Sequence, residues 1–302
     1  MKKIKSIVTG GAGFIGSNLV DRLVKEGQKI IVLDNFVSGK RSNLSHHLKK
    51  DVEIINLDIS NAKKLDKYLK DVSYVFHLAG LAEIVPSIKN PKKYFINNVL
   101  GTLNMLEAAK KAKVKKFIYA ASSSCYGSPK KIPTSETDKI DTQHPYAFTK
   151  FLGEEAVIKY AKFFKMPNIS CRFFNVYGPR LNTTGQYGAV FSNFLNQKKK
   201  KRPLTIVGNG KQTRDFIHVD DLTNAFIKLA RSNFKNKIYN LGSGKETSIN
   251  KIAHIIGGKK VFIPKRPGDP NRSCANISKI KKDIKWKPRI SIIDGIERLF
   301  QS

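Results

Sequence analysis

The 302-residue chain has few cysteines, few acidic side chains and no long apolar run, and each shortage excludes a class of protein. Its three cysteines, Cys125, Cys171 and Cys274, are too far apart for a disulfide framework or a cysteine-bound metal cluster, and they suit a reducing compartment. No run approaches the roughly 18 apolar residues that span a bilayer, and no signal-peptide core follows the basic start. We therefore expect a cytoplasmic protein with no membrane partner and no metal.

The shortage of acid leaves a large positive charge. The chain has 56 lysines and arginines against 23 acidic residues, a formal net charge of +33. Such a chain can bind nucleic acid, an anionic membrane surface or anionic small molecules. Its lysines are scattered in short clusters, without interleaved aromatics or a zinc or helix-turn-helix signature. We interpret the charge as a solvated surface that binds no nucleic acid, although its field would attract a nucleotide-linked substrate.

A glycine-rich turn at residues 9–16 follows a β-branched run and opens a helix-like segment. Backbone N–H groups and the positive end of the helix dipole would meet there, as a pyrophosphate requires. Gly10 can form the tight turn, Gly13 leaves room for phosphates, and Gly16 lets the helix lie close to the strand. The next apolar run ends at Asp34, within reach of a ribose 2′-hydroxyl, and its charge would repel a 2′-phosphate. The pattern predicts NAD rather than NADP as the cofactor.

Strand and helix patterns alternate through the first half, which predicts an α/β fold with a doubly wound, Rossmann-like parallel sheet. We expect strands at residues 4–9, 28–33, 53–57, 73–79, 115–121 and 169–174, and helices at residues 14–27, 61–70, 92–112 and 145–164. Beyond residue 179 the sequence is richer in turns. We expect an NAD-binding domain at residues 1–178, to which 215–241 returns, and a smaller C-terminal substrate-binding lobe at residues 179–302.

A second constellation combines Tyr146 and Lys150 with Ser122, which follows a predicted strand. On a helix, residues four apart share a face, so the two side chains would be neighbours. An ammonium beside a phenol lowers the pKa of the phenol from about 10 toward neutrality. Tyr146 could then take a proton from a sugar hydroxyl at pH 7, with Ser122 binding the same hydroxyl.

These residues resemble the extended short-chain dehydrogenases/reductases, specifically the nucleotide-sugar 4-epimerases of the UDP-glucose and UDP-N-acetylglucosamine type. The resemblance covers essentially the whole chain and includes the motifs at residues 75–80, 97–102, 119–127, 172–180, 212–219 and 266–269. It implies a cofactor site formed by Gly10, Gly13, Phe14, Ile15, Gly16, Asp34, Asn35, Ser38, Gly39, Asp58, Ile59, Leu78, Ala79, Gly80, Asn97, Tyr146, Lys150 and Phe174. It also implies a homodimer and a role in polysaccharide biosynthesis.

The same resemblance implies catalytic and substrate-binding residues. Catalysis would involve Tyr146, Lys150, Ser122 and Ser123, and the UDP-sugar would contact Ser122, Ser124, Asn175, Val190, Arg214, Arg266, Asp269 and Ser273. The arginines suit this role for a separate reason, because a guanidinium pairs bidentately with phosphate oxygens. Ser273 falls where these enzymes place a gate beside the C2 substituent of the sugar, and an offset of one residue would move that gate to Arg272 or Cys274.

Two missing carboxylates bear on the type of reaction. Family dehydratases carry an Asp-Glu pair directly after the residue that matches Ser122, and this chain has Ser123 and Ser124 there. Without a second acid, the site could oxidise C4 and reduce it again, which favours 4-epimerisation through a 4-keto sugar over elimination. Another NAD-dependent sugar-nucleotide modification, such as dehydration, is the alternative. A non-catalytic dinucleotide sensor is more remote, because a sensor has no need of the Tyr146 base.

Overall fold

The computed structural model describes residues 3–61, 63, 65–181, 190–264 and 271–301, and the chain forms two compact units. The first unit comprises Met1–Ser122, His144–Arg172 and Thr223–Tyr239; the second comprises Ser123–Gln143, Phe173–Leu222 and Asn240–Ser302. This division differs from the expected domain boundaries in two respects. Residues 123–143 belong to the second unit, and the chain returns to the first unit at Thr223 rather than at residue 215.

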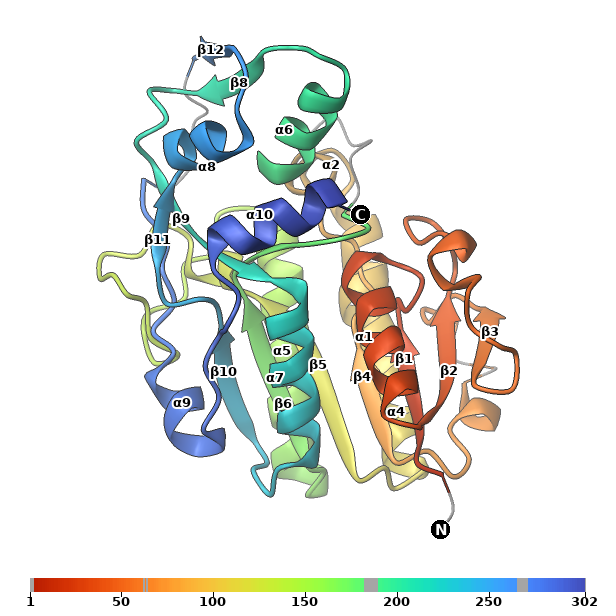
Figure 1. The fold of residues 1–302 in the computed structure, drawn as a ribbon. Coiled ribbons are helices and arrows are strands. Elements are labelled where there is room, and N and C mark those ends of the chain that lie inside the picture. The colour runs from red at the N-terminus through yellow and green to blue at the C-terminus, as the bar shows by residue number, and fades with distance from the viewer. Residues whose placement is uncertain (1–2, 62, 64, 182–189, 265–270, 302) are drawn as a thin grey trace. The chain divides into compact units, whose positions relative to one another are not determined.

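The first unit is built on a seven-stranded sheet with the order β10-β6-β5-β4-β1-β2-β3 (Figure 1). Its strands are β1 (Lys5–Thr9), β2 (Lys29–Asp34), β3 (Val52–Asn56), β4 (Tyr74–His77), β5 (Lys116–Ser122), β6 (Asn168–Phe173) and β10 (Lys237–Leu241). β1 pairs in parallel with β2 and with β4, and the strand order reverses at that point. The doubly wound Rossmann-like sheet is therefore confirmed, and ligands of such sheets bind at this reversal, beyond the carboxyl ends of the strands.

Helices cover both faces of this sheet. α1 (Phe14–Lys25) and α7 (Val219–Arg231) lie on one face, and α4 (Gly101–Lys111) and α5 (Pro145–Phe164) on the other (Figure 1). The apolar faces of α4 and α5 pack with the strands into a core that contains Ile7, Val75, Met105, Phe117 and Val157. No helix within the described residues is both long enough and apolar enough to cross a membrane.

Two expected helices take other forms. Of the described residues in the segment predicted as a helix at 61–70, Lys63 and Asp66–Tyr68 (η3) are 3-10 helical, and η3 lies between the buried Leu65 and Leu69. The segment predicted at 92–112 is helical, but it divides into α3 (Pro91–Tyr94), a π-helix η4 (Phe95–Leu100) and α4. Two shorter elements, η1 (Arg41–Leu44) and α2 (Ile84–Lys89), follow β2 and β4.

The second unit contains two small sheets with a core of its own. A three-stranded sheet has the order β11-β9-β7, and β12 pairs with β8 in a second sheet. Its elements are η5 (Ser123–Tyr126), β7 (Asn175–Tyr177), α6 (Val190–Lys199), β8 (Leu204–Val207), β9 (Thr213–His218), β11 (Glu246–Ser248), α8 (Ile249–Ile256), β12 (Lys260–Ile263), α9 (Ser278–Ile284) and α10 (Ile292–Gln301). Because β9 pairs with β7 and β11, the chain before Thr223 stays in this unit. In its core Tyr177 stacks on Phe191, and Phe216 meets Phe191 edge to face.

Candidate active site

The glycine turn between β1 and α1 requires glycine at two positions. Gly10 has a φ of 68°, and a Cβ on it would lie 2.8 Å from the backbone nitrogen of Ala79. A Cβ on Gly16 would collide with the carbonyl oxygen of Gly10 and lie 2.8 Å from Gly11 Cα. These distances agree with the steric roles expected of Gly10 and Gly16, while the contact of both with a pyrophosphate stays a prediction.

The N-terminus of α1 has no side-chain cap at this turn. Its N-cap residue is Gly13, which has no side chain to accept from the first-turn N–H groups, and the first turn contains no acidic residue. The half-buried Phe14 and Ile15 contribute amides of that turn. Arg22 and Lys25 lie in the last turn, where they complement the negative end of the helix dipole. These features fit an anionic pyrophosphate at the start of α1.

Asp34 joins the glycine turn to the segment that follows β2. Its Oδ2 accepts a hydrogen bond of 2.9 Å from the N–H of Ala12, and its Oδ1 accepts one of 2.8 Å from the N–H of Phe36. A Cβ on Gly39 would lie 2.9 Å from Oδ2, so this segment passes close to the carboxylate. A carboxylate offers about four acceptor positions, so the two backbone bonds leave capacity for a ribose hydroxyl. Asp34 therefore fits the NAD ribose.

The polar groups next to β3 lie at the surface. Asp58 Oδ1 accepts from the N–H and the hydroxyl of Ser60 at 2.9 and 2.7 Å, and its Oδ2 accepts from Asn35 Nδ2 at 3.1 Å. Partial burial raises the pKa of Asp58, but the hydrogen bonds from Ser60 and Asn35 outweigh it and the net pKa is lowered. Ser38 is exposed, whereas the side chain of Ile59 packs into the core. Asn35, Ser38, Asp58 and Ile59 were all predicted to contact the cofactor. Of these four, only Ile59 has a buried side chain.

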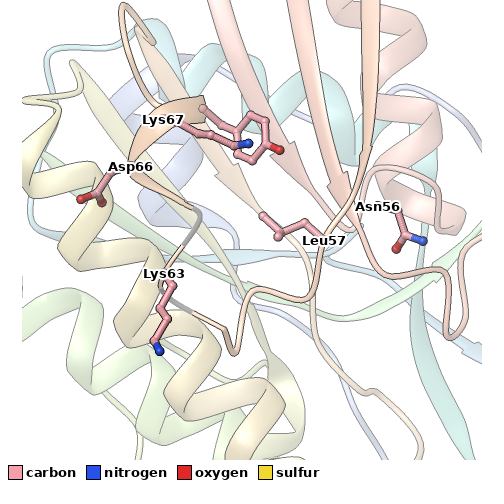
Figure 2. A pocket seen from close by; sticks show the side chains of 6 residues that line it. Asn56, Leu57, Lys63, Asp66 and Lys67 are labelled. Carbon is pink, nitrogen blue, oxygen red and sulfur yellow. The ribbon is translucent and has the colours of Figure 1, made fainter.

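A pocket of about 430 Å³ opens beyond β3 (Figure 2). It is lined by Asn56, Leu57, Lys63, Asp66, Lys67 and Tyr68. Asp66 pairs with Lys111 at 2.9 Å, and the ammonium of Lys67 lies 4.7 Å from the centre of the Tyr68 ring. None of the six lining residues was predicted to bind cofactor or substrate, so this pocket adds nothing to the candidate site.

A buried chain of hydrogen bonds holds the segment after β4 against β1. Thr9 Oγ1 accepts from the N–H groups of Leu78 and Ala79 at 3.2 and 3.1 Å and lies 2.7 Å from His77 Nδ1. His77 Nε2 lies 2.9 Å from Thr102 Oγ1, whose own hydroxyl donates to a backbone carbonyl. The proton of the ring is therefore on Nε2. Burial and then the charge of a nearby lysine lower the pKa of His77 to about 3, so the ring is neutral at pH 7.

Asn98, which sequence reasoning did not single out, fixes the same segment from the π-helix η4. Its side chain accepts from the N–H of Leu81 at 2.7 Å and donates to Leu81 O at 3.0 Å and to Thr149 Oγ1 at 3.1 Å. A Cβ on Gly80 would lie 2.9 Å from Asn98 Oδ1. The predicted neighbour, Asn97, is half-buried and donates to a backbone carbonyl one turn earlier. The sequence shows two adjacent asparagines, Asn97 and Asn98, at this position. It does not show that the helix here is π-helical, and this register decides that Asn98, not Asn97, contacts the segment after β4.

Tyr146 lies in the first turn of α5. Its N–H donates to Ser87 Oγ at 3.1 Å, and its ring stacks on His144, with centroids 5.8 Å apart and an interplanar angle of 7°. His144 caps the helix, because its Nδ1 accepts from the N–H of Ala147 at 3.1 Å. Burial lowers the pKa of His144, which keeps the capping ring neutral. The backbone and ring of Tyr146 are thus held from both sides.

Lys150 lies one turn further along α5 and is buried. Burial lowers its pKa to about 7, although the carboxylate of Glu154 acts in the opposite direction. Its ammonium lies 4.3 Å from the centre of the Tyr119 ring and 3.9 Å from the position of a Cβ on Gly80. The structure thus brings Lys150 to the segment predicted to line the cofactor site. With a pKa near neutrality, Lys150 holds its proton more firmly when an anion lies beside it.

The three predicted serines lie where β5 ends. Ser122 is the last residue of β5 and is buried, and Ser123 and Ser124 open the 3-10 helix η5 in the second unit. Both of these are half-buried. Their hydroxyls cannot serve as carboxylates at neutral pH.

Two of the predicted substrate residues, Asn175 and Arg214, lie on the three-stranded sheet of the second unit. Asn175 begins β7 and donates through Nδ2 to the carbonyl of Asp215 at 3.2 Å on the neighbouring β9. Arg214 lies on β9, half-buried. Phe174 is buried just before β7, and Val190 is the first residue of α6. The sheet therefore brings Asn175 and Arg214 onto adjacent strands.

Asp215 fixes the segment that carries Ser273. This buried carboxylate accepts from the N–H and hydroxyl of Ser243, both at 2.6 Å, and from the N–H of Ala275 at 3.0 Å. Burial raises the pKa of Asp215, and the hydrogen bonds partly offset that rise. Ser273 is half-buried. Arg266 and Asp269, which were also predicted to contact substrate, lie outside the described residues.

The two alternative gate positions have other contacts. The side chain of Cys274 is buried, and burial raises its pKa to about 12. Arg272 Nε donates to Glu246 Oε1 at 3.0 Å, in an exposed two-point ion pair. Of the three positions, Ser273 is the one whose small side chain is only half-buried.

The chain matches known proteins over most of its length. The sequence profile of the NAD dependent epimerase/dehydratase family matches residues 6–242. The chain belongs to this family. Over 302 residues it is 37% identical to a protein of Methanocaldococcus jannaschii that carries the provisional name UDP-glucose 4-epimerase, covering 97% of this chain and 96% of that protein.

Members with other reactions are also similar. UDP-glucuronic acid decarboxylase 1 of Arabidopsis thaliana is 35% identical, over 99% of this chain and 69% of its own length. Among solved structures, UDP-N-acetylglucosamine 4-epimerase from Methanobrevibacter ruminantium, in complex with UDP-N-acetylmuramic acid, superposes with a TM-score of 0.93. It is 32% identical and covers 100% of this chain and 99% of that one.

Family membership confirms the resemblance, the Rossmann-like fold and NAD as the cofactor. The cofactor also fits this chain's own geometry. A Cβ on Gly10 or Gly16 would collide with the turn, α1 lacks a side-chain cap, and the Asp34 carboxylate lies beside this turn with acceptor capacity left. The roles of the individual residues stay predictions.

Proposed function

We propose that this member of the epimerase/dehydratase family reversibly inverts C4 of a UDP-hexose or UDP-N-acetylhexosamine through a 4-keto sugar. The observation that carries this proposal is the pair formed by Tyr146 and the buried Lys150 on α5. The similarity to 4-epimerases over nearly the whole chain supports the same reaction.

Tyr146 acts as the base. Its phenolate accepts the proton of the 4-hydroxyl, and the same group returns a proton when the 4-keto sugar is reduced. Lys150 stabilises the phenolate by its charge, and the phenolate in turn keeps Lys150 protonated, because opposite charges favour each other's ionised form. Ser122, at the end of β5, binds the 4-hydroxyl and orients it toward Tyr146.

All the predicted cofactor residues except Phe174 belong to the first unit. Gly10, Gly13 and Gly16 with the start of α1 would hold the pyrophosphate of NAD, and Asp34 its adenosine ribose. Bound there, NAD would supply a reversible hydride acceptor for C4, so the reaction would have no net redox change. The 4-keto sugar must turn over between the two hydride transfers, so the protein must hold the nucleotide while it leaves the sugar free to rotate.

The nucleotide is held by the second unit in this proposal. Arg214 and Arg266 pair with the diphosphate, and Asn175 adds a hydrogen bond. Ser273 lies beside C2 of the sugar, where a small side chain leaves space for an N-acetyl group. We infer that N-acetylated UDP-hexosamines are substrates.

A second candidate reaction is decarboxylation of a UDP-uronic acid. One observation favours it, the 35% identity to UDP-glucuronic acid decarboxylase 1 of Arabidopsis thaliana. Ser123 and Ser124 argue against elimination, because no carboxylate follows Ser122 to protonate a leaving hydroxyl. A non-catalytic sensor would not need the Tyr146–Lys150 pair.

Incubation of the purified protein with UDP-glucose, UDP-N-acetylglucosamine, UDP-glucuronic acid and TDP-glucose tests the reaction. Proton NMR should show the C4 epimer of at least one UDP-sugar, with the mass of the nucleotide sugar unchanged. A product lighter by one water would identify a dehydratase, and one lighter by carbon dioxide a decarboxylase. No change in any of these sugars would contradict the proposal.

We also propose that the protein is a cytoplasmic homodimer that supplies sugars for polysaccharide synthesis. Exposed apolar side chains of the first unit support the dimer. The rings of Phe95 on η4 and Phe148 on α5 meet edge to face, with their centres 5.8 Å apart. Ile96 and Leu100 on η4 and Phe163 on α5 are also exposed. Exposed aromatic and aliphatic groups gathered in this way are typical of protein interfaces.

A further inference from the structure

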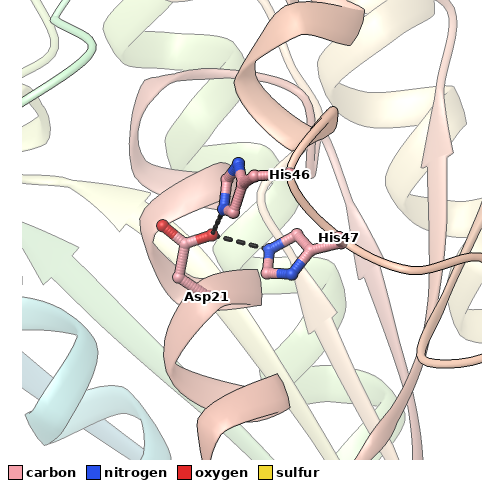
Figure 3. A group of neighbouring side chains, drawn as sticks. All are labelled: Asp21, His46 and His47. Carbon is pink, nitrogen blue, oxygen red and sulfur yellow. Dashed lines mark hydrogen bonds and ion pairs between the residues drawn. The ribbon is translucent and has the colours of Figure 1, made fainter.

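Asp21, His46 and His47 form a cluster on the first unit that the proposed reaction does not use. Asp21 lies on α1, and the two histidines follow η1 after β2 (Figure 3). His46 Nε2 and His47 Nε2 lie 2.9 and 2.7 Å from the same atom, Asp21 Oδ1. Both rings therefore direct the same nitrogen toward one carboxylate oxygen.

This convergence is close to the geometry of a metal site. The three ligand atoms lie within 4.8 Å of one another. Ligands at about 2.1 Å from one ion are themselves about 3.0–3.4 Å apart in octahedral or tetrahedral coordination. The two nitrogen-to-oxygen distances are only a few tenths of an ångström shorter, so small side-chain movements would admit an ion. An imidazole binds a metal through a ring nitrogen that carries no proton, so with Nε2 on the ion each ring would carry its proton on Nδ1.

The ligand set selects the kind of ion. Two imidazoles and one carboxylate suit Zn²⁺ and its neighbours Co²⁺ and Ni²⁺, whereas Mg²⁺ and Ca²⁺ prefer sites made of oxygen. The side chain of His47 is 9% exposed and would anchor the ion, while that of His46 is 54% exposed and leaves the site open to solvent. Three protein ligands with an open side leave a coordination position for water.

The cluster also joins two segments of the predicted cofactor site. Within residues 35–47, the N–H of Lys40 and the side chain of Asn43 both donate to Ala12 O in the glycine turn, at 3.0 and 2.8 Å. At the other end of residues 35–47, His46 and His47 contact the carboxylate of Asp21 on α1. A metal at the cluster would close the segment onto α1 at a second point.

We propose that Asp21, His46 and His47 bind one divalent transition metal ion, such as Zn²⁺, and that this ion clips the segment after β2 to α1. The site is separate from the residues of the proposed reaction and does not depend on it.

Titration of the chelator-treated, dialysed protein with ZnCl₂ tests the site by calorimetry. We expect one saturable site, and the variants Asp21→Asn and His46→Gln should weaken it by more than about tenfold, since even second-shell changes cost 10–100-fold. His254→Gln is the matched control, because His254 is an exposed histidine on α8 of the second unit. It should bind Zn²⁺ like the wild type. His46 is largely exposed, so its replacement leaves the fold intact.

Two further measurements assign the metal to these three residues. Co²⁺ should give an absorption spectrum without thiolate charge-transfer bands, since the three cysteines are buried and distant in sequence from the cluster. Zn²⁺ should slow hydrogen exchange of the backbone at residues 41–47 in the wild type but not in His46→Gln. The proposal is wrong if the wild type shows no saturable Zn²⁺ binding, if the cluster variants bind as tightly as the wild type, or if exchange at residues 41–47 does not change.

Discussion

The two units of the chain differ in how firmly they hold the residues assigned to them. In the first unit, Asp34, Leu78 and Lys150 lie in or directly beside the parallel sheet and its helices, and buried hydrogen bonds fix most of their surroundings. In the second unit, Arg214 lies on a short three-stranded sheet and Ser273 on an irregular segment held by Asp215. The predicted chemistry is thus attached to the parallel sheet and its helices, whereas the predicted selectivity residue Ser273 lies on an irregular segment, the kind of segment that varies most readily.

The largest expected effect is on the base of the first unit. Tyr146→Phe should keep the fold and bound NAD but lower turnover by roughly 10²–10⁴-fold, because positioned acid–base catalysis contributes about that much. Steady-state assays on the best UDP-sugar would measure it. The control is Tyr160→Phe on the same helix, whose hydroxyl bonds to Glu107 instead. Rates like those of the wild type in Tyr146→Phe would show that Tyr146 is not the base.

The next effect concerns the cofactor end of the same unit. Asp34→Ala should weaken the binding of NAD by about 1.5–3 kcal/mol, because a charge-assisted hydrogen bond is lost, and it should reduce the discrimination against NADP. Because Asp34 also accepts from Ala12 and Phe36, Asp34→Asn is the matched variant that keeps an acceptor but removes the charge. Calorimetry with both dinucleotides would separate these contributions. Wild-type protein that purifies with NADP would overturn the assignment.

A change in the second unit should alter selectivity instead of chemistry. Ser273→Tyr should reduce kcat/KM for N-acetylated UDP-hexosamines by on the order of tenfold or more, through steric exclusion, and should leave UDP-glucose largely unaffected. Competition between the two sugars measures the ratio directly. If the ratio of turnover of the N-acetylated sugar to that of UDP-glucose is the same in wild type and variant, Ser273 is not the gate. Substrate selectivity would then not depend on this segment of the second unit.

The last prediction concerns the stability of the cofactor-free protein. Lys150 has a folded pKa of about 7, below the unfolded value of 10.5, so between these values the unfolded chain binds more protons than the folded one. Stability of the cofactor-free protein should therefore rise with pH from about 7 to 10.5, by at most about 1.4 kcal/mol per unit. Urea unfolding at pH 7 and pH 9 should show this rise, and Lys150→Met should reduce it. If the free energy of unfolding rises with pH as steeply in Lys150→Met as in the wild type, the burial of Lys150 does not cause the rise.

Much of this architecture follows from local patterns. The runs before Gly10 and Asp34 are β-branched and end in residues that turn, so strand ends and the residues just beyond them could be predicted. The expected helix at residues 61–70 is a different case. Leu65 and Leu69 have helical spacing and both are fully buried, but the residues between them form the 3-10 helix η3, so the apolar pattern indicated burial and not helix type. The structural division also differs from the predicted return to the first domain at residue 215, because β9 pairs with β7 and β11 of the second unit.

The family, the doubly wound sheet and the cofactor could all be predicted from the sequence, because they depend on short motifs and on the order in which strand and helix patterns follow one another along the chain. The states of the histidines and of Lys150 depend instead on tertiary contacts. His77 is neutral because it is buried between two threonines, and His46 and His47 meet Asp21 because η1 folds back onto α1. Burial and contacts between distant segments set these properties, and neither can be inferred from neighbours along the chain.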